Sequence, residues 1–440
     1  MKSLKKRDNS IPRKFYELDL DDRLDYLKKE TNLTAKDTKL LKDLPKNFSF
    51  NKIDKMIENC IGIIPIPLGV ATNFVINGKK YLIPISIEEP SVIAAASKAA
   101  KIASTGGGFT AEADDSIMIG QIQLISRDKN NRDRLKSKRE RERVTKIIID
   151  NKEELLNIAN SRSISVIAKD IKVRELYDES INNMGYMIII ELIVDTRDAM
   201  GANVINTMCE SIAPKIEKIS NSKVVLKILS NYSIHRLARC RATFPKNLIG
   251  GKKGVDKILL AYAFAYSDVF RAVTHNKGLM NGIDALAIAT GQDFRALEAS
   301  IHAYAARDGK YRSLTKWYKS RKGDLIGEIE LPMAIGIVGG IVSVHPIVRI
   351  VLKILDIKNV KELASIFAAI GLAQNFAAIR ALADEGIQKG HMKLHARNIA
   401  ITAGAKENQV DFIAERMLKE NNVSVNKAKE VIQLIKTTRN

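Results

Sequence analysis

A Lys, a His and two Asn stand close together in the segment Thr274–Gly282, and these residue types suit the stabilisation of charge on a carbonyl oxygen. Lys277 supplies the cation. The segment lacks helical or strand periodicity, so we expect a turn bracketed by glycines. Three other unusual segments, Glu88–Ser91, Gly291–Asp293 and Gly390–Met392, add acids and a further His. A Lys, two acids and a His are the groups that proton-coupled carbonyl chemistry requires.

These segments resemble those of the soluble, class II hydroxymethylglutaryl-CoA (HMG-CoA) reductases. The resemblance runs from about residue 15 to the C-terminus and rests on seven ordered motifs. The motifs are Glu58–Gly62, Glu88–Ser91, Asp198–Asn203, Thr274–Gly282, Gly291–Asp293, Gly371–Asn375 and Gly390–Met392. The resemblance implies that HMG-CoA is reduced to mevalonate and CoA in two hydride steps, for isoprenoid biosynthesis. The alternative within this class is an NAD-linked catabolic enzyme that oxidises mevalonate to HMG-CoA.

The resemblance gives four residues catalytic roles. Lys277 is expected to stabilise the oxyanion, and Glu89 to donate its proton, which requires that burial raise the pKa of that carboxyl group. Asp293 is expected to lie between Lys277 and Glu89 and to tune both, although an Asp before Phe294 is also a typical helix N-cap. His391 is expected to protonate the departing CoA thiolate, because a pKa near neutrality suits that transfer.

The resemblance also implies substrate contacts. Arg271 is expected to bind the HMG carboxylate through paired hydrogen bonds, because a guanidinium group matches that geometry. Four further residues match positions near the substrate or the catalytic Lys: Ser91, Asn281, Gln374 and Asn375.

The cofactor site is expected where a strand ends and a helix opens near Gly201. Small residues there allow backbone N–H groups to approach a pyrophosphate. NADH-using members of the class carry an Asp just after the helix that we expect at 150–160. Ser163 stands at that position beside Arg162, which suits a 2′-phosphate, so we predict NADPH, with NADH possible. The full cofactor set is Asp198, Met200, Gly201, Ala202, Asn203, Asn231, Arg162 and Ser163.

The expected elements indicate an α+β chain with one domain inserted in another. Asn77-Gly78 predicts a β-hairpin, after which Pro90 opens a helix and Glu89 lies at the strand-to-helix junction. A small ferredoxin-like domain is expected from strands at 119–125, 164–173, 186–195 and 223–229, with helices at 150–160 and from Gly201. We expect a mainly helical substrate domain (1–115 and 225–382), an NAD(P)-binding domain (116–224) and a helical C-terminal flap (383–440), whose helices follow a turn at Gly390-His391.

The net charge of +21 makes a nucleic-acid-binding protein the competing class, with the basic segment 127–146 as its surface. Aromatic residues are only 5% of the chain, so we expect no nucleic-acid partner. Three Cys without metal-ligand spacing lead us to expect no metal site. No apolar run reaches the ~20 residues that span a bilayer, and we therefore expect a cytoplasmic protein without a membrane partner. The family resemblance implies a homodimer with active sites between subunits, and a higher oligomer of such dimers is compatible with it.

Overall fold

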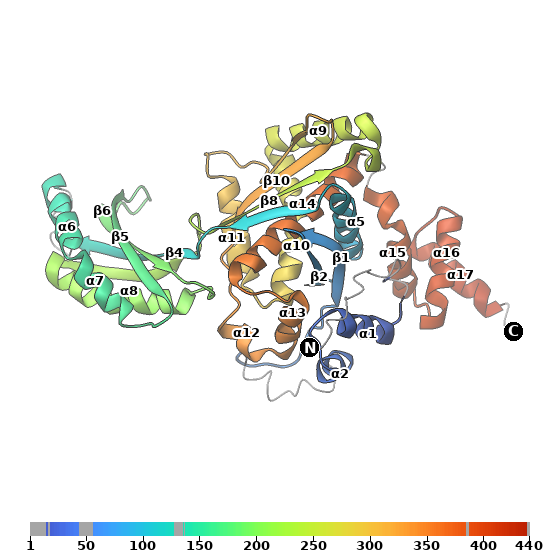
Figure 1. The fold of residues 1–440 in the computed structure, drawn as a ribbon, viewed down its shortest axis with the longest axis horizontal. Helices are drawn as coiled ribbons and strands as arrows, with labels where there is room; N and C mark the ends of the chain where they lie inside the picture. Colours follow the sequence, from blue (N-terminus) through green and yellow to red (C-terminus); the bar gives the residue numbers. More distant parts are fainter. Residues whose placement is uncertain are drawn as a thin grey trace, which may run out of the picture.

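The molecule consists of a large central unit, a small unit on one side and a helical C-terminal unit on the other (Figure 1). This computed structural model describes residues 15, 18–43, 56–126, 135, 137–383 and 387–437. The small unit interrupts the large one, because its strands come between β3 (Phe109–Ala113) and β8 (Leu237–Phe244) in the chain. The predicted α+β class with one unit inserted in another is confirmed.

A mixed six-stranded sheet is the frame of the large unit. Its order is β2-β1-β3-β8-β10-β9, and the described pairs are antiparallel except β1 with β3. The remaining strands are β1 (Leu68–Ile76), β2 (Lys79–Ser86), β9 (Thr315–Lys319) and β10 (Leu325–Pro332). Three strands, β8 to β10, lie where we expected mainly helix. Their stability depends on cross-strand partners distant in sequence, such as Arg239 of β8, which pairs with Glu330 of β10 at 2.7 Å.

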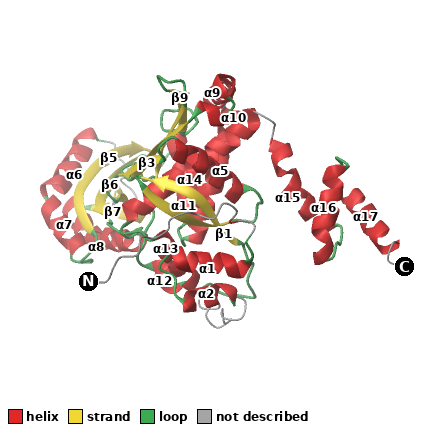
Figure 2. Cartoon of the chain, turned by 45° about the vertical axis from the view of Figure 1, so that its right-hand side comes forward, coloured by secondary structure: helices red, strands yellow, loops and turns green. Residues whose placement is uncertain are grey.

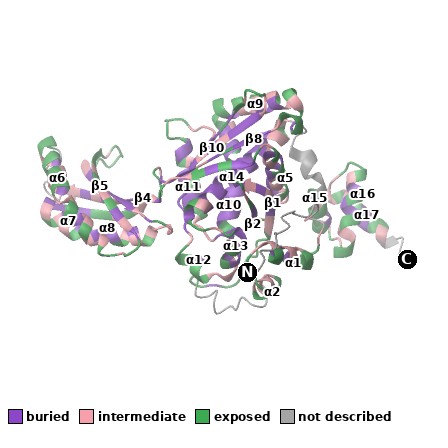
Figure 3. Cartoon of the chain, viewed as in Figure 1, coloured by how far each residue is buried: buried purple, intermediate pink, exposed green. Residues whose placement is uncertain are grey.

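Helices cover this sheet, and α14 is the most deeply buried of them (Figure 3). The helices of the unit are α1 (Leu20–Glu30), α2 (Ala35–Lys42), α5 (Val92–Thr105), α9 (Gly251–Ser267), α10 (Val269–Ala289), α11 (Phe294–Ala305), α12 (Gly340–Val344), α13 (Pro346–Leu355) and α14 (Val360–Ala383), with a 3-10 turn at Lys246–Leu248. By length and composition α14 could cross a membrane. Its most apolar stretch is 67% buried, however, and Phe376 stacks on Phe244 of the sheet at 3.8 Å between ring centroids. An apolar helix of this kind is the core helix of a globular unit.

The small unit has a four-stranded antiparallel sheet in the order β5-β6-β4-β7, which is the ferredoxin-like arrangement that we predicted. Its elements are β4 (Ile117–Ser126), α6 (Lys138–Asp150), α7 (Lys152–Asn160), β5 (Ile167–Tyr177), β6 (Tyr186–Asp195), α8 (Ala202–Ser220) and β7 (Ser222–Ser230). The helix α8 packs closely on β4, because a Cβ on Gly120 would lie 2.4 Å from the sulfur of Cys209. Of the basic segment 127–146, residues 127–134 and 136 lie outside the described part of the chain.

Three helices form the C-terminal unit, which stands to the side of the large unit (Figure 2). They are α15 (Ile387–Thr402), α16 (Val410–Lys419) and α17 (Val425–Thr437), with a 3-10 turn at Glu407–Gln409. A separate apolar core that includes Ala396, Ile413 and Met417 holds them together. Gly390 and His391 lie within α15, so the predicted turn at these residues is wrong.

The segment Thr274–Gly282 lies inside the helix α10, and the turn predicted for it is also wrong. Its glycines serve helix packing. A Cβ on Gly278 would lie 3.4 Å from Ala378, and one on Gly282 would lie 3.2 Å from the Cβ of Gln374, both on α14. Because a glycine in a sequence pattern usually marks a turn, this tertiary use of glycine misled the prediction.

Candidate functional site

Lys277 and Glu89 form the centre of the candidate site. The Nζ atom of Lys277 lies 3.6 Å from Oε2 of Glu89. Lys277 projects from α10, and Glu89 lies between the end of β2 and the start of α5, at the predicted strand-to-helix junction. The side chain of Lys277 is 63% exposed and that of Glu89 is 42% exposed. The burial expected for a proton-donating Glu89 is therefore not provided by one copy of the chain.

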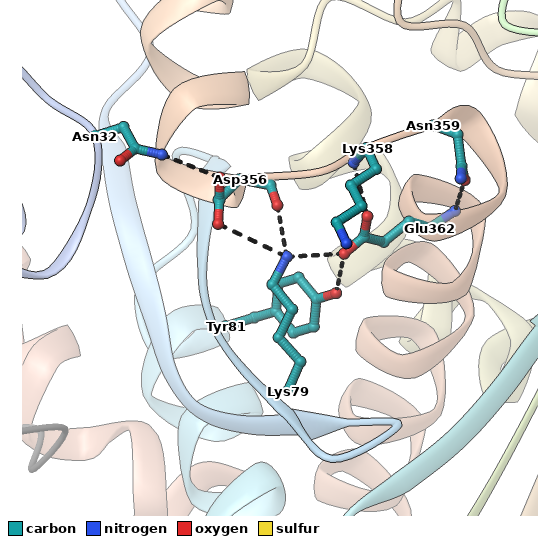
Figure 4. A network of polar contacts seen from close by, with 7 residues as sticks. All are labelled: Asn32, Lys79, Tyr81, Asp356, Lys358, Asn359 and Glu362. Carbon is teal, nitrogen blue, oxygen red and sulfur yellow. Dashed lines mark hydrogen bonds and ion pairs between the residues drawn. The ribbon is translucent and has the colours of Figure 1, made fainter. Parts of the chain in front are cut away.

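A polar network holds the hairpin that leads to Glu89 (Figure 4). Lys79 Nζ donates to Glu362 Oε1 at 2.8 Å and to the backbone oxygen of Asp356 at 2.5 Å, and the Tyr81 hydroxyl donates to the same Glu362 oxygen. Glu362 belongs to the first turn of α14. The network thus joins β2 to α14. The hairpin turn at Asn77-Gly78 is confirmed, with φ values of 49° and 79°.

Two of the predicted substrate contacts carry buried polar atoms without a partner. The Oγ of Ser91 and the Oε1 of Gln374 are buried, and neither has a hydrogen-bond partner among the residues that the structure describes. An unsatisfied buried polar atom is costly, so these atoms are suited to bind a ligand. Ser91 is the N-cap of α5 with φ of 76°, a strained conformation typical of functional sites. The helix begins at Val92, two residues after the predicted start at Pro90.

Arg271 and Asn281 lie on α10 before and after Lys277. Arg271 is half-buried, and burial lowers the pKa of its guanidinium group. No ion pair of Arg271 is found within the described ranges, which leaves the guanidinium group able to bind a carboxylate. Asn281 lies one helical turn beyond Lys277, so both side chains project from the same side of the helix.

The Asn375 side chain bonds to neighbouring groups of the protein, and its predicted place near the substrate stays a prediction. Its side chain is 1% exposed; Oδ1 accepts from Thr315 Oγ1 and from Trp317 Nε1, both at 3.1 Å, and Nδ2 donates to the His275 carbonyl at 3.1 Å. His275 Nε2 lies 2.8 Å from Thr315 Oγ1. Burial, reinforced by the positive charge of Arg271, lowers the pKa of His275 to about 3, so this ring is neutral.

This network fixes the helix that carries Lys277, and the sequence interpretation missed its role. Helical spacing of the apolar residues in this segment would have indicated that His275 faces the interior. The positions Ala272, His275, Leu279 and Ile283 are buried at helical spacing, which identifies the inward face of α10.

Asp293 lies in the turn between α10 and α11. It is the N-cap of α11, where Oδ1 accepts from the Ala296 amide at 3.2 Å, and it pairs with Arg295 at 3.1 Å. The N-cap alternative is thus confirmed. The helix α10 continues for 12 residues beyond Lys277 to Ala289, which at 1.5 Å per residue places these two residues about 18 Å apart. Among the described residues Asp293 pairs with Arg295, whereas Lys277 pairs with Glu89, so the place of Asp293 between Lys277 and Glu89 stays a prediction.

The fourth predicted catalytic residue, His391, belongs to α15. Its side chain lies outside the part of the chain whose side chains the structure describes. Its catalytic role stays a prediction.

The predicted cofactor segment connects β6 to α8 and has the geometry of an anion site. Gly201 is the N-cap of α8 with φ of 96°, and a Cβ there would lie 2.3 Å from Thr196 Cγ2. No side chain caps this helix start, so the first N–H groups, from Ala202 onward, are open to a pyrophosphate. The residues present therefore fit a dinucleotide. Met200 precedes Gly201, and Asn203 is exposed in the first turn of α8.

Asp198 and Asn231 are two other members of the predicted cofactor set. The Asp198 carboxylate accepts from the Val360 amide at 2.9 Å, so it caps α14 and anchors the loop to the large unit. Asn231 is exposed directly after the end of β7.

Arg162 and Ser163 lie in the turn after α7, as predicted. Ser163 Oγ accepts from the Val166 amide at 3.0 Å, which shapes the turn, and Arg162 is exposed. β5 follows, and its residue Ile167 pairs with Asp195 at the end of β6. The turn before β5 and the 196–201 loop after β6 therefore lie at the same end of these two neighbouring strands.

Large apolar side chains are exposed on α9 and on the Lys277 side of α10. Phe270 is 84% exposed and Val273 is 49% exposed, on the same side of the helix as Lys277, and Leu260 and Phe264 of α9 are 72% and 59% exposed. A cavity of about 380 Å³ elsewhere, beside Tyr26, contains none of the predicted site residues. The described residues include no group of three or more His, Cys, Asp or Glu that could hold a metal ion.

Comparison with known proteins gives consistent matches. Residues 19–396 match the family model described as hydroxymethylglutaryl-coenzyme A reductase. The chain is 48% identical over 423 residues to the 3-hydroxy-3-methylglutaryl-coenzyme A reductase of Archaeoglobus fulgidus, covering 96% of this chain and 94% of that protein. It is 36% identical over 385 residues to the probable reductase of Borreliella burgdorferi, covering 85% of each.

Solved structures from Streptococcus pneumoniae are also similar. The 3-hydroxy-3-methylglutaryl-coenzyme A reductase of this species matches with a TM-score of 0.78 and 35% identity, covering 97% of this chain and 100% of that chain. The class II reductase bound to NADPH in open conformations matches with a TM-score of 0.76 and 36% identity, covering 95% of this chain and 100% of that chain.

Proposed function

The chain belongs to the hydroxymethylglutaryl-coenzyme A reductase family, and we propose that Glu89 and Lys277 of one copy and Asp293 of a second copy form its reaction centre. The enzyme is an oxidoreductase that reduces HMG-CoA to mevalonate and CoA with NADPH, in the mevalonate pathway. The observation that carries the assignment of the centre is the 3.6 Å pairing of Lys277 with Glu89. The buried polar atoms of Ser91 and Gln374 that have no partner among the described residues support it.

The side chains at this centre match the demands of the reaction. NADPH, when bound, supplies the hydride in each of the two reductions. The Lys277 ammonium stabilises the negative charge that develops on the carbonyl oxygen, and the Glu89 carboxyl group supplies the proton that this oxygen takes up. Arg271 holds the HMG carboxylate, while Ser91, Asn281 and Gln374 bind the rest of the acyl group. Asn375 acts through α10, because its amide bonds the backbone of that helix.

A homodimer completes the site. Exposed apolar side chains on α9 and on the Lys277 side of α10 are suited to contact a second copy, which would cover them and exclude water from Glu89. In a two-fold interface each copy gives the other the same residues. Two α10 helices that pack antiparallel would bring the C-terminal end of one, with Asp293, toward Lys277 of the other. Higher assembly of such dimers is compatible with this surface.

The C-terminal unit supplies His391. A His with a pKa near neutrality can protonate the CoA thiolate after the carbon–sulfur bond breaks, so that the thiolate does not re-add to the aldehyde. The unit has its own core, which allows it to move as one body over the site. We assign it residues 383–440, with 1–115 and 225–382 as the substrate domain and 116–224 as the cofactor domain. The strand β7 of the small unit continues to Ser230, so it crosses the boundary proposed between residues 224 and 225.

NADPH preference follows from Arg162 and Ser163. A guanidinium group and a hydroxyl group at the ribose end suit a 2′-phosphate, whereas an Asp there would repel it. NADPH use favours biosynthesis over the NAD-linked oxidation of mevalonate. We place the enzyme in the cytoplasm, without a metal ion, a membrane partner or a nucleic-acid partner.

The first test is absorbance at 340 nm with purified protein, HMG-CoA and either NADPH or NADH. We expect about two NADPH oxidised per CoA released, faster than with NADH. Lys277→Ala should lower turnover by about 10²–10³-fold or more, because it removes an oxyanion contact, without a change in thermal unfolding. Near-normal turnover of this variant would remove the assignment of the reaction centre.

A further inference from the structure

The segment 335–338 lies against the cofactor loop 196–201. The Ile337 amide donates to the Asp198 carbonyl at 2.8 Å. The approach is so close that a Cβ on Gly336 would lie 2.5 Å from a backbone nitrogen of the loop. Only glycine permits this contact, so any shift of the segment moves the loop with it.

The opposite side of the same segment is bonded to the turn that carries Asp293. Gln292 Nε2 donates to the Gly336 carbonyl at 2.8 Å, and the Gly336 amide donates to Gln292 Oε1 at 2.8 Å. A second bond of Nε2, to the Thr290 carbonyl at 3.0 Å, fixes the Gln292 side chain within its own turn. The amide group therefore matches the Gly336 backbone in both directions.

Arg236 joins the loop and the segment from within the protein. It is 4% exposed; Nη1 donates to Thr196 Oγ1 at 3.1 Å and to the Ala199 carbonyl at 3.3 Å, and Nη2 donates to the Ile335 carbonyl. Burial lowers the pKa of Arg236 to about 10, so the group stays charged at neutral pH. A planar guanidinium group can reach three oxygens in fixed directions, which a Lys ammonium at the same place cannot.

We propose that Arg236 and Gln292 are positioning residues that hold the cofactor loop in register with the Asp293 turn through the segment 335–338. This inference rests on the proposed function, since it assigns the loop to NADPH. Neither residue touches the reacting atoms. Their effect is to keep the start of α8, and hence the pyrophosphate, at a set position relative to Asp293.

The test compares two buried arginines. Arg236→Lys keeps the charge but loses the three-way contact, and we expect the dissociation constant for NADPH to rise about tenfold or more. The Michaelis constant for HMG-CoA should stay within twofold. Arg141→Lys is the matched control, because Arg141 is 7% exposed and binds Glu175 and the Leu135 carbonyl in the small unit, away from the loop. Titration of NADPH fluorescence measures binding, and thermal unfolding measures the structural cost.

A second variant covers the case in which Arg236→Lys does not fold. Gln292→Met keeps the side-chain length but removes both bonds to Gly336, and we expect about three- to tenfold weaker NADPH binding with faster amide exchange at residues 336–337. Wild-type NADPH affinity in the folded variants, with stability losses like that of Arg141→Lys, would overturn the inference alone. A wild-type protein that binds no NADPH would overturn the proposed function and the inference together.

Discussion

Two inactive variants should restore activity when they share a dimer. Along α10, Lys277 and Ala289 are about 18 Å apart, and Asp293, which follows Ala289 by a turn, pairs with Arg295, so we expect Asp293 to serve the Lys277 of a second copy. We therefore combine Lys277→Ala and Asp293→Asn in one mixed dimer. One of its two sites then lacks both groups, and the other has an intact Lys277 from one chain and an intact Asp293 from the other.

Mixed dimers are isolated by co-expression with two different affinity tags, and turnover is followed at 340 nm. We expect about half of the wild-type rate per dimer, against a loss of about 10²–10³-fold or more for each variant alone. The control is a mixed dimer of Lys277→Ala and Glu89→Gln. Because Glu89 and Lys277 pair within one chain, both of its sites stay defective. Background activity in the first mixed dimer, or equal recovery in the control, would refute the shared site.

Three further outcomes are expected from single substitutions. Arg162→Ala should raise the Michaelis constant for NADPH about tenfold with little change for NADH, and equal changes for both would contradict a 2′-phosphate contact. Asn375→Leu should lower the free energy of unfolding in urea by about 3 kcal/mol, because it removes the three hydrogen bonds that Asn375 makes with Thr315, Trp317 and the His275 carbonyl. Burial, with the charge of Arg271, lowers the pKa of His275 from 6.5 to about 3, so only the unfolded chain is protonated between these values. The free energy of unfolding should therefore decrease as the pH is lowered through this window, by at most about 1.4 kcal/mol per pH unit. His275→Gln should lose less of this free energy than the wild type when urea unfolding is compared at pH 7 and pH 4.

The ordered motifs and the alternation of the strands were sufficient to predict several features. The Asn77-Gly78 hairpin, the ferredoxin-like unit and the place of Glu89 depend on local turn chemistry and on period-two patterns, which neighbouring residues determine. The strands β8 to β10 could not be predicted in this way. Arg239 makes β8 look unlike a buried strand, and only its pairing with Glu330 across the sheet explains it.

The sequence by itself determined which groups are available for the reaction: an amine at 277, carboxylates at 89 and 293, an imidazole at 391 and small residues before α8. The tertiary structure decided which of them meet. It pairs Lys277 with Glu89, places Asp293 at the start of the next helix, α11, and buries Asn375 as a support for α10. The reason is physical: side-chain chemistry belongs to the residue, whereas distance depends on rigid helices and on packing between segments far apart in the chain.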